Sequence, residues 1–98
     1  MVIETSIGNY LQNLRKERKM SLRDVADHIG IDISMLSKIE HGERQLQTHM
    51  LKDLCEIFEI DYKMMQIQLL NQKIENEYGS EPFILESIEQ YLNIKRNK

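Results

Sequence analysis

The sequence contains few of the residues that interrupt helices. Its 98 residues include one proline and four glycines. Proline and glycine are the strongest local breaks in regular structure, so their scarcity favours a few long helices over many short strands. No segment shows a long two-residue alternation of apolar and polar side chains, which is the pattern of a half-buried strand. The sequence therefore predicts an all-α fold.

Cysteine and long apolar runs are also scarce. The single cysteine, Cys55, excludes an intramolecular disulfide and a metal site built from several thiolates. No segment approaches the roughly 20 apolar residues of a membrane-spanning helix. The first residues lack the basic start and apolar run of a secretory signal. Together these absences predict a reducing, cytoplasmic setting with no membrane contact.

The sequence lacks the excess of positive charge that usually accompanies nucleic-acid binding. Lysine and arginine number 13 against 16 aspartates and glutamates, which gives a net charge of −3. The charge is unevenly distributed. Residues 1–48 hold seven basic and seven acidic side chains, whereas residues 49–98 hold six basic and nine acidic ones. A locally positive face in the first half is therefore compatible with the negative total.

Apolar residues recur at helical spacing along almost the whole chain. This spacing predicts helices over residues 7–19, 22–29, 33–41, 49–58 and 62–78, and a sixth that begins at Pro82 and carries apolar residues as far as Leu92. Short polar side chains at helix starts accept backbone N–H groups, so they predict the N-caps. The predicted N-caps are Ser21, Asp32, Thr48 and Asp61.

The segment SLRDVADHIGIDISMLSKIEHG, residues 21–42, has the pattern of two short helices joined at a glycine. Ala26 is small enough to let the helices cross closely, and Gly30 suits the left-handed turn between them. The inward-facing residues that would lock the crossing are Val25, Leu36 and Ile39. The outward face of the second helix would carry Ile33, Ser34, Ser37, Lys38 and His41. Such a helix can enter a DNA major groove about 12 Å wide.

These features resemble the phage-repressor and Cro-like family of helix-turn-helix proteins, also called the xenobiotic-response-element type. The resemblance spans residues 7 to about 67 and includes Leu36-Ser37-Lys38-Ile39-Glu40-His41-Gly42, which is close to the family's common LSKIERG. It also includes Leu14-Arg15-Lys16-Glu17-Arg18. It implies a five-helix DNA-binding domain over residues 1–66, with a C-terminal helical extension over residues 67–98.

The resemblance also implies roles for individual residues. Arg15 and Glu40 stand where many members form a salt bridge between the first and third helices. The positions expected at DNA are Ser21, Arg23, Asp32, Ile33, Ser34, Ser37, Lys38, His41, Arg44 and Gln45.

Three positions depart from the family pattern. Leu22 stands where glutamine commonly contacts a phosphate, and Glu43 stands where a basic residue is frequent. Ile33 replaces a common polar base-reading residue, although it could contact a thymine methyl group. These departures predict weak DNA binding by a single copy.

Other chemistry finds little support in the sequence. The three histidines do not have the spacing of metal ligands, and no nucleophile, base and orienting group converge in sequence. Cys55 lies on an apolar helical face, where packing is a better explanation than reactivity. We therefore expect neither an enzyme nor a protein that holds a metal or a cofactor.

The helix predicted over residues 62–78 is apolar on more than one side. Such a helix needs more than one neighbour. The helix-turn-helix core can cover one side, and either the last helix or a second subunit must cover the other. Two-fold symmetry doubles the bases that a small domain can read, which favours a homodimer. The residues expected at its interface are Ile67, Leu70, Ile74, Ile84, Leu85, Ile88, Tyr91 and Leu92.

The leading hypothesis is a sequence-specific transcriptional regulator that binds double-stranded DNA. It would act as a homodimeric repressor at an inverted-repeat operator. The alternative is an antitoxin-like or adaptor module, in which the C-terminal helices bind another protein and DNA contact is weak or absent. The electrically neutral first half and Leu22 favour this alternative.

Overall fold

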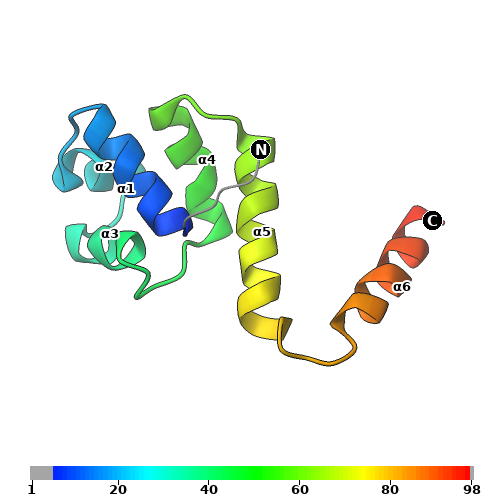
Figure 1. The fold of residues 1–98 in the computed structure, drawn as a ribbon. Helices are drawn as coiled ribbons and strands as arrows, with labels where there is room; N and C mark the ends of the chain where they lie inside the picture. Colours follow the sequence, from blue (N-terminus) through cyan, green and yellow to red (C-terminus); the bar gives the residue numbers. More distant parts are fainter. Residues whose placement is uncertain (1–5, 98) are drawn as a thin grey trace.

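A computed structural model describes residues 6–97 of the chain. Over these residues the chain forms α1 (Ile7–Glu17), α2 (Leu22–Ile29), α3 (Ile33–Glu40), α4 (Thr48–Phe58), α5 (Tyr62–Tyr78) and α6 (Ile84–Arg96). The all-α prediction is confirmed. Helices α1 to α4 cluster around one core, α5 runs beside them and beyond them, and α6 stands apart from the cluster (Figure 1).

The core is built from the apolar stripes that the helical spacing predicts. Phe58, Leu51 and Leu54 of α4 lie at its centre, each with no more than 1% of its surface exposed. From α5 only Met65 and Leu69 are buried. Helix α5 continues without a break across residue 66, so its first half belongs to the core and its second half extends past it.

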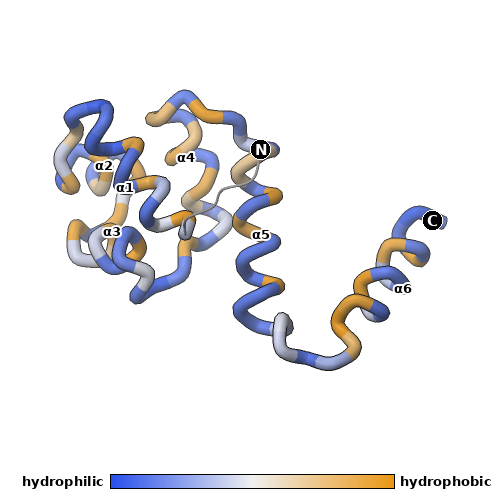
Figure 2. Tube along the Cα trace, viewed as in Figure 1, coloured by the Kyte–Doolittle hydropathy of each residue, from blue (hydrophilic) through white to orange (hydrophobic). Residues whose placement is uncertain are grey.

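Helix α6 contributes nothing to this core. None of the residues of α6 is buried, and Leu85 is 69% exposed. The molecule measures 44 × 26 × 23 Å and has a radius of gyration of 15.4 Å, whereas a compact chain of 100 residues has about 13 Å. Apolar residues nevertheless follow one another along α6 (Figure 2). We call the second half of α5 and all of α6, residues 70–96, the arm.

Four helix boundaries differ from the prediction. Helix α3 ends at Glu40 rather than His41, which is its C-cap. Helix α1 ends at Glu17 rather than Lys19, because Lys19 has a left-handed φ of 55°. Helix α4 is preceded by Gln47 as N-cap, so Thr48 is its first helical residue. Helix α6 begins at Ile84 rather than Pro82, because Phe83 has φ −114° and ψ 25° and does not continue a helix from the proline.

Candidate nucleic-acid interface

The start of α2 is held by a reciprocal pair of hydrogen bonds. Ser21 Oγ accepts a hydrogen bond from the Asp24 backbone N–H at 3.0 Å, and Asp24 Oδ2 accepts one from the Ser21 backbone N–H at 2.9 Å. The bond from the Ser21 backbone keeps the pKa of Asp24 below its ordinary value, and the Ser21 hydroxyl adds to this effect. Two orphan donors of the helix end are thereby satisfied. The sequence analysis expected the Ser21 cap but not the contribution of Asp24.

The turn between α2 and α3 depends on a glycine for its backbone conformation. Gly30 has φ 73° and ψ 36°, and its N–H donates to the Ala26 carbonyl. The next N–H, that of Ile31, donates to the same carbonyl at 3.0 Å. A Cβ at residue 30 would meet no other atom within 4 Å, so the dihedral angle rather than space is what requires glycine there.

Helix α3 is fixed on the core by one face. Leu36 and Ile39 are almost fully buried, as are Val25 and Ala26 of α2. Because successive residues of a helix turn by about 100°, this packing sends the remaining side chains of α3 outward. The crossing of α2 and α3 is therefore set by the small buried residue Ala26 and its larger neighbours.

An ion pair ties α3 to α1. Arg15 Nε lies 2.7 Å from Glu40 Oε2, and Arg15 Nη2 donates to Glu40 Oε1 at 3.1 Å. Arg15 Nη1 donates to the Met20 carbonyl at 3.0 Å. Arg15 and Glu40 are 9% and 2% exposed. The hydrogen bond to Glu40 raises the pKa of Arg15 above its ordinary value, so the Arg15 guanidinium stays charged. The bidentate pair anchors α3 to α1.

The outward face of α3 is accessible but not uniformly so. Asp32, Ser34 and Lys38 are exposed, whereas Ile33 and Ser37 are half-buried. Ile33 packs against the edge of the core, which leaves only part of its side chain available to a base. Ser34 and Lys38, four residues apart, lie on the same side of the helix.

His41 ends α3 with its ring turned back onto the helix. Its Nδ1 lies 2.7 Å from the Ser37 carbonyl oxygen and 3.5 Å from Ser37 Oγ. The shorter contact is a hydrogen bond in the tautomer that carries the proton on Nδ1. In that tautomer Nδ1 is already engaged, so any contact that His41 makes with DNA would use Nε2.

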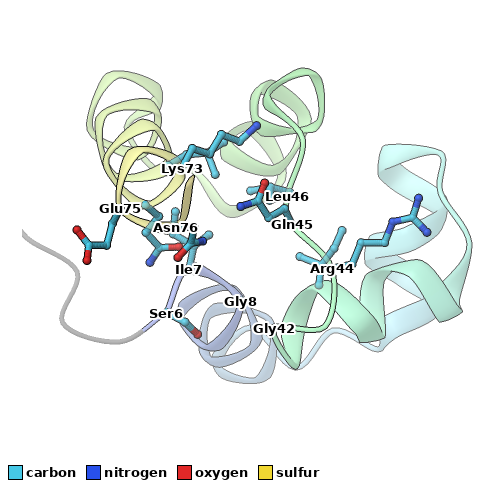
Figure 3. A pocket seen from close by; sticks show the side chains of 13 residues that line it. Ser6, Ile7, Gly8, Gly42, Arg44, Gln45, Leu46, Lys73, Glu75 and Asn76 are labelled. Carbon is cyan, nitrogen blue, oxygen red and sulfur yellow. The ribbon is translucent and has the colours of Figure 1, made fainter. Parts of the chain in front are cut away.

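The loop between α3 and α4 is ordered by the end of α3. The Lys38 carbonyl accepts hydrogen bonds from the Glu43 N–H at 2.8 Å and the Arg44 N–H at 3.3 Å, while Gly42 takes a φ of 78°. Arg44 and Gln45 are exposed. Figure 3 shows the Arg44 side chain extending away from the pocket beside this loop.

Charges of both signs surround this face. Its exposed cations are Arg23, Lys38 and Arg44. Asp24, Asp32 and Glu43 are also exposed there and offset these cations. The candidate interface therefore presents three separate cationic side chains rather than a broad positive surface.

Two residues that the sequence analysis did not single out hold the helices behind this face. A Cβ on Gly8 would collide with the carbonyl oxygens of Ile39 and Glu40, so α1 can cross the end of α3 only with glycine there. A glycine inside a helix is costly and implies a packing reason, which was the available signal. Arg18 donates from Nη2 to the Phe58 carbonyl at 2.8 Å and lies 5.7 Å from the centre of the Phe58 ring.

A pocket of about 370 Å³ lies beside the interface, between the start of α1, the α3–α4 loop and α5 (Figure 3). Arg44, Gln45, Glu75 and Asn76 are among the residues that line it, and the charged ends of Arg44 and Glu75 point away from it. Among the described residues, no group of three or more histidine, cysteine or acidic side chains could hold a metal ion. Residues 6–97 contain no helix that is long and apolar enough to cross a membrane.

Residues 8–75 match the family described as helix-turn-helix domain. The chain belongs to this family. The helix-turn-helix match covers α1 to α4 and most of α5, which includes every residue of the interface described above. This family is not enzymatic, as the sequence analysis expected.

A further similarity is to the HTH-type transcriptional repressor RghR of Bacillus subtilis (strain 168). The two proteins are 34% identical over 59 residues, which are 59% of this chain and 44% of RghR. This helix-turn-helix chain thus spans less than half the length of that relative. No solved structure is significantly similar to it.

The residues expected at a dimer interface lie outside the candidate nucleic-acid interface. Ile67, Leu70 and Ile74 are 46%, 43% and 38% exposed on α5. On α6, Leu85, Tyr91 and Leu92 are exposed, and Ile84 and Ile88 are half-buried. Within one copy, these side chains keep much of their surface open to solvent.

Proposed function

We propose that this helix-turn-helix chain is a sequence-specific DNA-binding transcriptional regulator. The observation that carries the proposal is the presentation of α3. Its inner face is buried on the core, the Arg15–Glu40 pair anchors it to α1, and Ser34 and Lys38 remain exposed on its outer face. Arg44 extends from the following loop, where a groove-bound helix would bring the DNA backbone.

The proposed contacts divide into two kinds. Ser34 and Lys38, in the first and last turns of α3, contact base edges, while Arg23 and Arg44 contact phosphates. The Ser21 hydroxyl accepts the Asp24 N–H, so it would meet a phosphate as a donor. Asp32, Ile33, Ser37, His41 and Gln45 complete the proposed surface. Base contacts give sequence preference, whereas phosphate contacts give affinity that falls as salt rises.

The test begins with DNA fragments selected by the intact protein from a random pool. With a selected fragment and a random one, Lys38→Ala should reduce the preference for the selected fragment by about 5- to 150-fold, because a good base contact contributes about 1–3 kcal/mol. Arg44→Ala should weaken binding to both fragments and reduce the salt slope by about one unit. Lys63→Ala, at an exposed position of α5, is the control and should change neither the preference for the selected fragment nor the salt slope. If Lys38→Ala lowers the affinity for every DNA sequence equally, Lys38 does not contact a base edge.

We also propose that two copies act together on an inverted repeat and repress by occupying a promoter. A single α3 reads few bases, and exposed apolar area on the scale of several hundred Å² usually marks a partner site. The outer face of α5 and the apolar side of α6 leave several large apolar side chains exposed, among them Ile67, Leu70 and Leu85. The proposed division places the DNA-binding part in residues 1–66 and the dimerisation part in residues 67–98. Because Leu69 is buried in the core, only the outer face of α5 would belong to the second part.

Deleting residues 80–98 tests this division. The shortened chain should be a monomer that keeps α1 to α5, because α6 contributes no buried residue to the core. It should lose operator binding. Sedimentation of both chains measures their mass, and circular dichroism measures their helix content. An intact protein that is monomeric at tens of micromolar would contradict the dimer and favour the alternative, a module that binds another protein through the same exposed helices.

A further inference from the structure

The ring of His41 is held in one orientation by its own helix. Its Nδ1 lies 2.7 Å from the Ser37 carbonyl oxygen, which can only accept a hydrogen bond, so Nδ1 carries the proton of the neutral ring. The two ring nitrogens point in widely different directions, which turns Nε2 away from α3. His41 is exposed at the end of this helix. Nε2 is therefore the ring nitrogen that a ligand can reach.

Uptake of a proton changes Nε2 from an acceptor into a donor. In the neutral ring Nε2 has a lone pair, which would repel a phosphate oxygen, because that oxygen is also an acceptor. In the charged ring Nδ1 keeps its hydrogen bond to the Ser37 carbonyl, and Nε2–H becomes a charged donor. Charge-assisted hydrogen bonds are about twice as strong as neutral ones. With Nδ1 bound to Ser37, only the protonated ring can donate to a phosphate.

His41 stands between two cations of the candidate nucleic-acid interface. Lys38 lies three residues before it and Arg44 three residues after it, and both are exposed. Side chains three residues apart on a helix are neighbours on its surface, so the ring lies beside Lys38. The C-terminal end of a helix also favours positive charge. Protonation of His41 would thus add a fourth cation to this interface.

The elements around the end of α3 carry other charges. Helix α1 contributes Arg15, which is already paired with Glu40. The others are Arg23 and Asp24 of α2, Glu43 of the loop after α3, and Lys73 and Glu75 of α5. Carboxylates, lysines and arginines keep their charge between about pH 6 and 8, whereas histidine exchanges its proton in this range. His41 is therefore the group in this part of the interface whose charge follows pH.

We propose that His41 takes up a proton when the chain binds DNA, and that its Nε2–H then donates to a phosphate oxygen. This inference rests on the proposed function, because it requires DNA along α3. The proton comes from the solvent and returns to it when the DNA dissociates. Binding and protonation favour each other reciprocally. The affinity for DNA should therefore rise as the pH falls through the range in which histidine titrates.

Binding measured at two pH values tests this coupling. By fluorescence anisotropy at constant ionic strength, the dissociation constant of the intact protein for a selected fragment should be about two- to fivefold lower at pH 6 than at pH 8, the effect of one exposed charge pair. His41→Gln should lose this difference. His41→Lys, charged at both pH values, should also lose it and should bind more tightly than His41→Gln at pH 8. His28→Gln, at an exposed position in the last turn of α2, is the control and should keep the wild-type difference.

Nuclear magnetic resonance of the ring nitrogens gives a test that needs no variant. In the free protein at pH 8, His41 should carry its proton on Nδ1. Adding the selected fragment at pH 7 should shift both ring nitrogens towards the values of the charged ring. A neutral ring that carries its proton on Nε2, or ring signals that do not change with DNA, would overturn the proposal.

The binding data also separate this inference from the proposed function. If the protein binds the selected fragment and His41→Gln has the same pH dependence as the wild type, proton uptake at His41 is wrong and DNA binding stands. Tight binding with no pH dependence in the wild type has the same meaning. If the protein binds no fragment at either pH, the proposed function is wrong, and the role of His41 is wrong with it.

Discussion

The packed part of the chain, from α1 to the first half of α5, and the arm differ in where their apolar side chains lie. Both parts place leucine and isoleucine at helical spacing. In the packed part, residues such as Leu51 and Leu54 are fully buried, but in the arm Leu85 and Leu92 are 69% and 42% exposed. The same pattern thus marks an internal core in one region and an unfilled contact surface in the other. Helical spacing identifies a face that needs a neighbour, but it does not say which chain supplies that neighbour.

Removing the ion pair behind α3 should have the largest effect on the packed part. Arg15→Ala should lower the free energy of unfolding by about 3–5 kcal/mol, because Glu40 would remain buried without its partner. Chemical denaturation measures the change. Lys16→Ala, at the neighbouring exposed position of α1, is the control and should change it by no more than about 0.5 kcal/mol. Equal effects of the two variants would mean that the pair is solvated in solution.

The same leucine-to-alanine change in both regions tests the comparison itself. Leu54→Ala should cost about 2–5 kcal/mol, because it opens a cavity in the core. Leu85→Ala should cost less than about 0.5 kcal/mol when measured at a protein concentration low enough to keep the chain monomeric. At higher concentration Leu85→Ala should instead weaken self-association. A large loss of monomer stability for Leu85→Ala would place α6 against the core.

The close crossing of α1 and α3 gives the next largest effect. Gly8→Ala should lower the free energy of unfolding by about 1–3 kcal/mol, because the added Cβ meets backbone carbonyl groups that cannot rotate away. Alanine normally stabilises a helix relative to glycine, so the sign of the result is diagnostic. Asn9→Ala, at the exposed neighbouring position, should be close to neutral. Stabilisation by Gly8→Ala would show that the helices cross farther apart.

The cap of α2 should have the smallest of these effects. Ser21→Ala should lower the free energy of unfolding by about 1 kcal/mol, while Ser34→Ala, in the exposed first turn of α3, should lower it much less.

Asp24 makes the stability depend on pH. Folding lowers its pKa through the Ser21 N–H, so its contribution is present at neutral pH and is lost as the pH falls through the folded-state pKa. The difference in Tm between wild type and Asp24→Ala should shrink accordingly between pH 7 and strongly acidic conditions.

Much of the packed part follows from local rules in the sequence. The spacing of apolar residues predicts all six helices, and Gly30 marks the turn because few other residues adopt its positive φ. The pairing of Arg15 with Glu40, 25 residues apart, came from family resemblance and not from any local pattern. The role of Gly8 was missed because it depends on two carbonyl groups more than 30 residues away. Tertiary contacts of this kind have no periodic signal.

The arm was less predictable for a physical reason. Its boundary at Pro82 was misplaced by two residues, because the backbone of Phe83 is not helical. Its apolar side chains stay largely exposed within one chain, and their assignment to a dimer interface stays a prediction. On the DNA side, the half-burial of Ile33 and the ring contact of His41 with Ser37 depend on rotamers and close packing. Neither the half-burial of Ile33 nor the contact of His41 with Ser37 can be predicted from residue type alone.

Helix α5 is unbroken and connects the packed part, which carries the candidate nucleic-acid interface, to the arm. Leu69 is buried in the core. The next turns of the same unbroken helix carry Ile74 and Tyr78, which line the groove of about 460 Å³ between α5 and α6. One residue inserted between Leu69 and Ile74 would rotate the arm by about 100° around the axis of α5 and move it about 1.5 Å farther along that axis. In the proposed dimer, an insertion or deletion at this one site would therefore change the separation and rotation of the two DNA-binding parts without altering any residue of the candidate nucleic-acid interface.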